Sequence, residues 1–167
     1  AIGANTLLFS IANPLVVRGL PIADPDGLGW IRAVNAPRQI ERGQLSMPDL
    51  AEFRDRARSF SSLAGYELVP ATLTGHQQDP ERIQTLAGTA NLTDVWGMKP
   101  QIGRLFQPAD GEPGRPIAAI LSDRFWRARF QSDPGVLGRQ WLLNNKPLVV
   151  VGIMPSDLEL GNMSLID

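Results

Sequence analysis

The sequence predicts an α+β domain in which helices pack on a mixed sheet. After Ser46, apolar residues recur at steps of three and four, which is the spacing of one helix face. The run 117–121 is entirely apolar, as expected for a buried strand. Residues 140–143 and 148–153 flank Asn144-Asn145, a pair that accepts positive φ and predicts a β-hairpin. Helical and extended patterns alternate along the chain, which favours helices against a sheet.

The composition is that of a globular protein and excludes several classes of site. The chain has 167 residues, 43% of them hydrophobic and 20% charged, enough for one domain or two small ones. The net charge of -1 provides no overall basic field for nucleic acid. Cysteine is absent and His76 is the only histidine. Thiol nucleophiles, disulfides and metal sites with two histidines are therefore excluded within this chain.

The N-terminal segment predicts the end of a membrane helix. Residues 1–17 carry no charge, and eleven of them are Ala, Val, Ile, Leu or Phe. A complete span needs about 20 residues, so we expect residues 1–20 to be the C-terminal part of a transmembrane helix. Residues 21–167 would then be a core domain, which we expect to be truncated at its C-terminal end. A buried N-terminal helix of a soluble protein and a signal peptide are the alternatives.

The first helix is expected to begin at Ser46, after a turn at 24–27 and a short strand at 30–34. Asp49 stands at the capping-box position and Pro48 lies in the first turn, where no amide donor is needed. Its apolar stripe, which we expect to face the core, consists of Leu50, Phe53, Ala57, Phe60 and Ala64.

Strands and short helices alternate in the rest of the chain. Residues 66–73 and 82–89 are predicted strands, and Pro70 places the first of them at a sheet edge. Asn91 is expected to cap a short helix that Gly97 stops. Residues 107–116 form a loop rich in proline and glycine. Ser122 is expected to cap a second long helix, whose apolar anchors are Phe125, Trp126 and Phe130.

No residue is predicted to be catalytic, to bind a cofactor or to ligate a metal. The sequence has neither a glycine-rich phosphate loop nor a Gly-x-Ser-x-Gly elbow. His76 lies in a polar turn without convergent partners. Asp49, Glu52 and Asp55 could form a carboxylate row, but three arginines alternate with them, which favours a solvated helix surface. We therefore expect no enzymatic activity and no ATP binding by this chain alone.

Short motifs along the chain, taken in order, resemble one protein family. They begin with residues 3–10 and 17–21 in the uncharged segment and its exit. They continue with Ser46-Met47-Pro48-Asp49-Leu50, Leu73-Thr74-Gly75, Pro80-Glu81-Arg82, Asp94-Val95-Trp96-Gly97, Pro100-Gln101-Ile102-Gly103-Arg104-Leu105-Phe106, Asp133-Pro134-Gly135-Val136-Leu137-Gly138-Arg139 and Val150-Val151-Gly152-Ile153-Met154-Pro155.

In this order the motifs resemble the MacB-like periplasmic core domain of FtsX-type ABC transporter permeases. The likeness is strongest to the subgroup with duplicated permease halves, which is abundant in acidobacteria. The resemblance implies an inner-membrane permease whose domain faces the periplasm or cell exterior. It also implies an ATPase on a separate subunit or domain, and a second permease subunit or duplicated half. In this family, the domain couples ATP hydrolysis to export or lipoprotein handling by mechanotransmission.

Two other functions are compatible with the residues. One is a free periplasmic domain that binds a ligand or protein without catalysis, which a cleavable signal and the lack of further membrane helices would favour. The other is a hydrolase that uses the row Asp49, Glu52 and Asp55, which would need a cleft and a fourth polar partner. The substrate and the direction of transport are not encoded in any recognisable motif.

Overall fold

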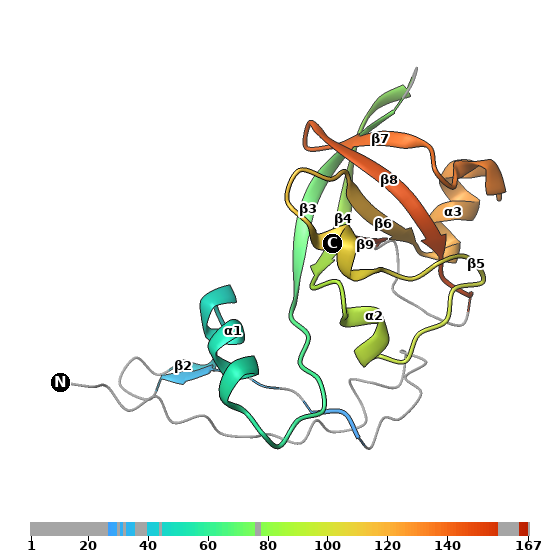
Figure 1. Cartoon of the computed structure of the whole chain (residues 1–167). Coiled ribbons are helices and arrows are strands. Elements are labelled where there is room, and N and C mark those ends of the chain that lie inside the picture. The colour runs from blue at the N-terminus through green and yellow to red at the C-terminus, as the bar shows by residue number, and fades with distance from the viewer. Residues whose placement is uncertain are drawn as a thin grey trace. The chain divides into compact units, whose positions relative to one another are not determined.

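The computed structural model describes residues 27–29, 31, 33–35, 40–43, 45–75, 78–156 and 164–166 (Figure 1). These residues fall into two units, one ending at Leu63 and the other continuing from Ala64. The membrane helix expected in residues 1–20 lies outside the described residues. Within the described part, no helix is both long enough and apolar enough to cross a membrane.

The first unit contains a strand pair and one helix. β1 (Ala33–Asn35) pairs antiparallel with β2 (Ile40–Gly43), and β2 had no counterpart in the sequence prediction. α1 (Met47–Arg56) begins as predicted. The Ser46 hydroxyl accepts a hydrogen bond from the Asp49 amide, and the Asp49 carboxylate accepts one from the Ser46 amide. These two bonds satisfy amides that the first helical turn leaves free.

The predicted length of this helix was wrong. α1 ends at Arg56 and does not continue to Ala64, because Ala57 adopts an extended conformation. The Arg54 guanidinium donates two hydrogen bonds, of 3.0 and 2.8 Å, to the Leu63 carbonyl oxygen, so the chain after the helix folds back toward it. Of the predicted stripe, only Leu50 is buried, and the other four residues are half-buried. The rings of Phe53 and Phe60 still pack together, with centroids 6.3 Å apart.

The second unit is a mixed sheet with two α-helices, which confirms the predicted fold class. Its strands are β3 (Tyr66–Gly75), β4 (Gln78–Gly88), β5 (Ile102–Gly103), β6 (Ile117–Leu121), β7 (Gln140–Leu143), β8 (Lys146–Ile153) and β9 (Ser164–Ile166). Its helices are α2 (Leu92–Val95) and α3 (Asp123–Phe130), with 3₁₀ turns η2 (Pro108–Gly111) and η3 (Pro134–Val136).

The strand pairing closes on itself. Neighbours follow the order β8, β6, β9, β4, β3 and β7, and β7 pairs in turn with β8. The β6–β8 and β4–β9 pairs are parallel, and the other pairs are antiparallel. Each strand of this ring therefore has a hydrogen-bonded neighbour on both sides for part of its length. Sequence patterns predicted most of the strands but not this closure.

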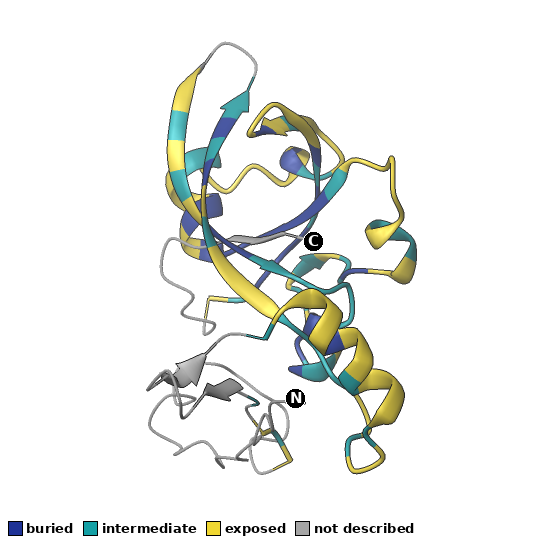
Figure 2. Ribbon diagram, turned by 90° about the vertical axis from the view of Figure 1, so that its left-hand side faces the viewer, coloured by how far each residue is buried: buried dark blue, intermediate teal, exposed yellow. Residues whose placement is uncertain are grey.

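Alternate residues of the strands face a common apolar core. Figure 2 shows that the buried positions run along the strands, and Phe125 and Trp126 of α3 are buried as well. The main core cluster combines residues from β3, β6, α3, η3, β7 and β8: Ala71, Leu73, Ala119, Leu121, Phe125, Trp126, Val136, Leu143, Leu148, Val150 and Ile153. Thr85 is also fully buried, and its hydroxyl donates a 2.7 Å hydrogen bond to the Val69 carbonyl oxygen.

Pro70 lies on a sheet edge, as its sequence context predicted. Thr72 exchanges hydrogen bonds with Asn144, through its amide and its carbonyl, so its backbone groups face β7. Backbone direction alternates along a strand, so Pro70 faces the same side. Among the described residues, β7 pairs with β3 only at Leu73 and Thr74. At Pro70 the edge therefore lacks an amide donor, which discourages pairing with another chain.

Local turn chemistry followed the sequence with one exception. Asn144 and Asn145 have φ of 48° and 65°, and Gly97 has φ of 63°, as the hairpin and helix stop required. The Ser122 hydroxyl caps α3 by accepting the Phe125 amide. Asn91 directly precedes α2, as predicted, but its side chain makes no capping hydrogen bond. The predicted capping role of this side chain was therefore wrong. Its amide oxygen accepts instead from the Thr89 hydroxyl.

Gly103, at the β5–β8 contact, should be needed both for its positive φ and for its lack of a side chain. Gly103 has φ of +80°, and a Cβ there would collide with the Val151 carbonyl oxygen and approach Gly152 Cα to 2.9 Å. Gly114 has φ of +87° and open space around it. In urea unfolding, we expect Gly114→Ala to cost about 1 kcal/mol for positive φ alone and Gly103→Ala clearly more. Equal losses would mean that β5 moves away without cost.

Candidate functional site

The most distinctive motif, residues 100–106, forms the corner where β5 meets β8. The Gln101 amide donates to the Ile153 carbonyl oxygen, and the Arg104 amide donates to that of Val151, both at 2.9 Å. A Cβ on Gly152 would collide with the Arg104 carbonyl oxygen. The two backbones can approach this closely only because residues 103 and 152 are glycines.

The Gln101 side chain joins three elements at this corner. Its Nε2 donates to Asp123 Oδ1 and to the Met154 carbonyl oxygen, both at 2.8 Å. Arg127 Nε donates to the other carboxylate oxygen of Asp123 at 2.6 Å. Burial raises the pKa of Asp123, but the hydrogen bonds from Gln101 and Arg127 prevail and hold that pKa below its ordinary value. The start of α3 is thus tied to β5 and to the end of β8.

A second clamp fixes the chain that follows the motif. Two nitrogens of Arg104 donate to the two carboxylate oxygens of Asp110, at 2.6 and 2.8 Å. Asp110 also accepts a 2.7 Å hydrogen bond from the Gln107 amide. The side-chain hydrogen bond from Arg104 is the main cause that lowers the pKa of Asp110. This bidentate pair holds η2 against the corner.

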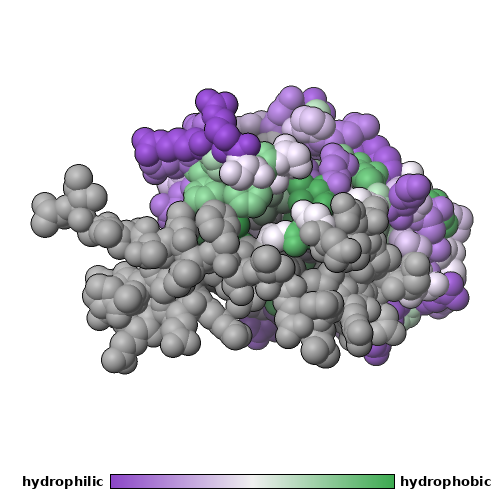
Figure 3. Space-filling view, turned by 90° about the horizontal axis from the view of Figure 1, so that it is seen from below, coloured by the Kyte–Doolittle hydropathy of each residue, from purple (hydrophilic) through white to green (hydrophobic). Residues whose placement is uncertain are grey.

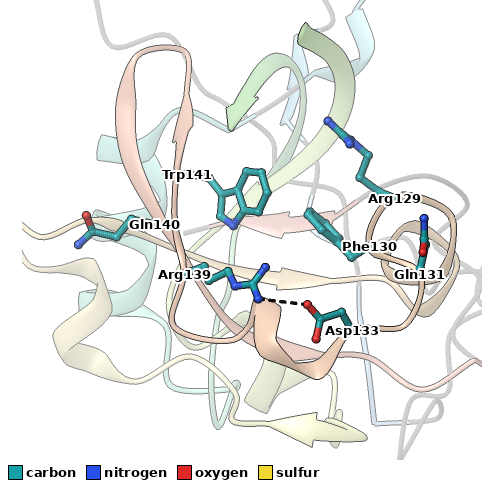
Figure 4. A pocket seen from close by; sticks show the side chains of 7 residues that line it. All are labelled: Arg129, Phe130, Gln131, Asp133, Arg139, Gln140 and Trp141. Carbon is teal, nitrogen blue, oxygen red and sulfur yellow. Dashed lines mark ion pairs between the residues drawn. The ribbon is translucent and has the colours of Figure 1, made fainter. Parts of the chain in front are cut away.

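An open hollow of about 390 Å³ lies between the end of α3, η3 and the start of β7 (Figure 4). Its lining combines aromatic, charged and amide side chains, namely Arg129, Phe130, Gln131, Asp133, Arg139, Gln140 and Trp141. Arg139 Nη2 lies 3.2 Å from Asp133 Oδ2, the ion pair drawn in Figure 4. A concave surface of this size with mixed polar and aromatic walls can hold a small molecule.

The three carboxylates that could form a row, Asp49, Glu52 and Asp55, all belong to α1. Asp49 completes the capping box, and the Ser46 hydroxyl lowers its pKa. Glu52 forms an exposed i,i+4 ion pair with Arg56 at 2.8 Å. Asp55 is exposed. His76 lies outside the described residues. In the part of the chain that the structure describes, no cluster of three or more His, Asp or Glu side chains could hold a metal ion.

The comparisons with known proteins identify the family. The family described as the MacB-like periplasmic core domain matches residues 1–167. The chain belongs to this family. No match was found among the curated proteins.

Solved structures share the fold of this MacB-like domain. The extracellular domain of the ABC-type transporter YknZ from Gram-positive bacteria has a TM-score of 0.60 at 18% identity, covering 73% of this chain and 62% of that one. The periplasmic region of MacB from Actinobacillus actinomycetemcomitans has a TM-score of 0.59 at 18% identity, covering 77% and 57%. A domain of a permease protein from Porphyromonas gingivalis has a TM-score of 0.50 at 14% identity, covering 70% and 54%.

The MacB-like domain thus spans about six-tenths of the length of the first two solved domains. The predicted family and its extracytoplasmic, permease-associated character are confirmed at this level. The acidobacterial subgroup and the domain boundaries at residues 20 and 21 stay predictions.

Sequence reasoning missed the hollow and the two clamps of the MacB-like domain. Arg129 and Trp141 lie twelve positions apart, on α3 and β7, and only tertiary folding brings both to one concave surface. The partners Gln101 and Asp123 are separated by 22 positions. The only sequence signal for the clamps was the motif 100–106, which contains Gln101 and Arg104. It does not indicate which residues bind these two side chains.

The Arg104–Asp110 clamp should make stability depend on pH in the acid range. The folded-state pKa of Asp110 is lowered, so its contribution is complete above the unfolded pKa of about 3.9. That contribution is lost as the pH falls through the folded-state pKa. At pH 7, we expect Asp110→Asn to lower the free energy of unfolding by about 1–3 kcal/mol. The variant should also lose less stability than the wild type on acidification.

Urea unfolding at pH 7, 4 and 3 measures both effects. Glu112→Gln is the matched control, because Glu112 pairs with Arg115 at 3.0 Å but both side chains are 58% exposed. Such a surface pair contributes about 0–1 kcal/mol. Identical pH profiles for Asp110→Asn and the wild type would show that the clamp does not contribute to stability.

Proposed function

We propose that residues 21–167 are the extracytoplasmic domain of an ABC transporter permease subunit that couples cytoplasmic ATP hydrolysis to export or to the handling of lipoproteins or other substrates. The observation that carries this proposal is the match of the family over the whole chain. The shared fold with extracytoplasmic domains of two ABC-type transporters supports it. The domain would act by mechanotransmission, passing motion from the membrane to a substrate or partner outside.

The construction of the sheet suits a domain that transmits force. Its strands form a closed ring, and a load on one strand is therefore shared by neighbours on both sides. The two clamps add charge-assisted hydrogen bonds of 2.6–2.8 Å at the β5–β8 corner, and such bonds are stronger than neutral ones. A body of this kind moves as a unit and does not yield locally.

The proposal assigns every chemical step to other parts of the transporter. The ATPase would be a separate subunit or a fused domain in the cytoplasm, and a second permease subunit or duplicated half would face this one. Residues 1–20 would anchor the domain in the bacterial cytoplasmic membrane, with the domain in the periplasm or at the cell exterior. No nucleic-acid partner, cofactor or catalytic residue belongs to this proposal.

Movement between the two extracytoplasmic domains is the first test. The chain has no cysteine, and Arg115 is exposed at the surface, so Arg115→Cys provides one defined label site. With the equivalent site labelled on the second domain of the assembled transporter, the distance between spin labels should differ between nucleotide-free and ATP-trapped states. The labelled transporter must keep its ATPase rate as the control. An unchanged distance distribution would contradict mechanotransmission.

The anchor is tested by removing it. We expect the chain without residues 1–21 to be a soluble monomer that unfolds cooperatively, whereas the intact chain should need detergent, because exposed apolar surface promotes association. Size-exclusion chromatography and thermal melts of both chains measure this. A well-behaved intact monomer together with an unfolded deletion variant would refute the anchor. That result would favour the free periplasmic binding domain.

A further inference from the structure

The indole of Trp141 contains a buried donor that lacks an acceptor. Trp141 Nε1 is buried, and no acceptor for it exists among the described residues. The other indole near this surface is satisfied, because Trp126 Nε1 donates a 2.9 Å hydrogen bond to the Asp133 carbonyl oxygen. Buried donors without acceptors are rare in native proteins, since nothing compensates for the water that they lose. The position of the Trp141 side chain is therefore less favourable than its packing alone would make it.

Phe130 and Trp141 form a wall that two spaces have in common. One space is the open hollow of about 390 Å³. The other is a void of about 20 Å³ among core side chains, and all residues that line it are apolar except Thr85. The two rings of the wall meet edge to face, with centroids 5.0 Å apart. Side chains next to a void lack contacts on that side, so space is available around this ring pair.

Gly75, at the end of β3, holds the indole from another direction. A Cβ on Gly75 would collide with Cζ3 and Cε3 of Trp141, which belong to the six-membered ring of the indole. Gly75 does not have a positive φ, so its backbone conformation does not require glycine. The ring can occupy its position only because residue 75 has no side chain.

The hollow can accept the ring if the ring moves outward. Figure 4 shows the indole at this surface beside Arg139. The arginines at the rim are paired, Arg129 with Glu81 at 2.7 Å and Arg139 with Asp133 at 3.2 Å. The rim is therefore electrically balanced, and an indole that moves over it does not desolvate an unpaired charge. An N–H that turns into the open hollow binds water.

Apolar side chains at other parts of the surface are in a different situation. Leu68 and Leu142 are 51% and 40% exposed, and Figure 3 shows apolar side chains among polar ones on one face of the molecule. Exposure of this kind is ordinary for a folded protein. At Trp141, by contrast, an unpaired buried donor and space on both sides of the wall occur together.

We propose that Trp141 is a gate in the wall between the hollow and the core. In the closed position, which the structure shows, the indole rests against Gly75 and its N–H is buried. In the open position the ring turns into the hollow, its N–H binds water, and the hollow is connected with the void. Opening gives up apolar burial and gains a solvated donor, so the open position is a minor state. The gate does not depend on the transport function.

Hydrogen exchange of the Trp141 indole N–H, followed by ¹H–¹⁵N NMR of the 167-residue chain, tests the gate. Trp141→Phe identifies the signal by its loss. Exchange through a local opening does not depend on urea below the unfolding transition, whereas the amides of β8, a core strand, should exchange faster as urea is added. We therefore expect a constant rate for the indole N–H. A rate that rises in parallel with those of the β8 amides would refute the gate.

Gly75→Ala should favour the open position, because its Cβ takes the space of the closed ring. We expect the Trp141 N–H to exchange about tenfold faster than in the wild type, as for an overpacked contact. Gly114→Ala is the matched control, since a Cβ there meets no atom within 4 Å although its positive φ lowers stability. It should keep the wild-type rate. An unchanged rate in Gly75→Ala, or equal acceleration in both variants, would also overturn the gate.

Discussion

β8 has hydrogen-bonded neighbours on both of its edges from Leu148 onward, and the rest of the sheet depends on this strand. One edge pairs with β6 from Leu148 to Ile153. The other edge pairs first with β7 and then with β5. Between these two partners, the amides of Gly138 and Arg104 donate to the carbonyl oxygens of Val150 and Val151. Because buried backbone groups must be paired, this one strand fixes where β5, β6 and β7 lie.

The ring of strands explains why the core and the corner are one system. β7 reaches both β8 and β3, so the apolar faces of β3, β7 and β8 enclose the same side chains, including Leu73, Leu143 and Leu148. At the other end of β8, Gln101 binds both Asp123 and the Met154 carbonyl oxygen. The start of α3 is thereby coupled to the end of β8. This link is compatible with the mechanotransmission that we propose for the domain.

The hollow beside α3 lies where the polar side chains are less well paired than at the β5–β8 corner. Its aromatic wall continues the core, since Phe130 and Trp141 pack against the main cluster. Its rim carries ion pairs that are exposed or poorly aligned, in contrast to the bidentate Arg104–Asp110 pair. Polar groups in a core are normally satisfied within it. Trp141 Nε1 is a buried donor without an acceptor among the described residues at this border.

The sequence by itself determined the local features of the fold. The caps of α1 and α3 and the Asn144-Asn145 turn follow from contacts within a few positions. The edge position of Pro70 and the burial of strand 117–121 follow from the missing amide of proline and from the apolar residues of the strand. Its motifs also identified the family. Tertiary structure alone decided the end of α1, where Arg54 binds Leu63, the role of Asn91, the closure of the ring through β7, and the partners of Gln101 and Arg104. These features depend on backbone direction and side-chain reach between distant segments, and a hydrophobic pattern specifies which residues are buried but not which segments meet.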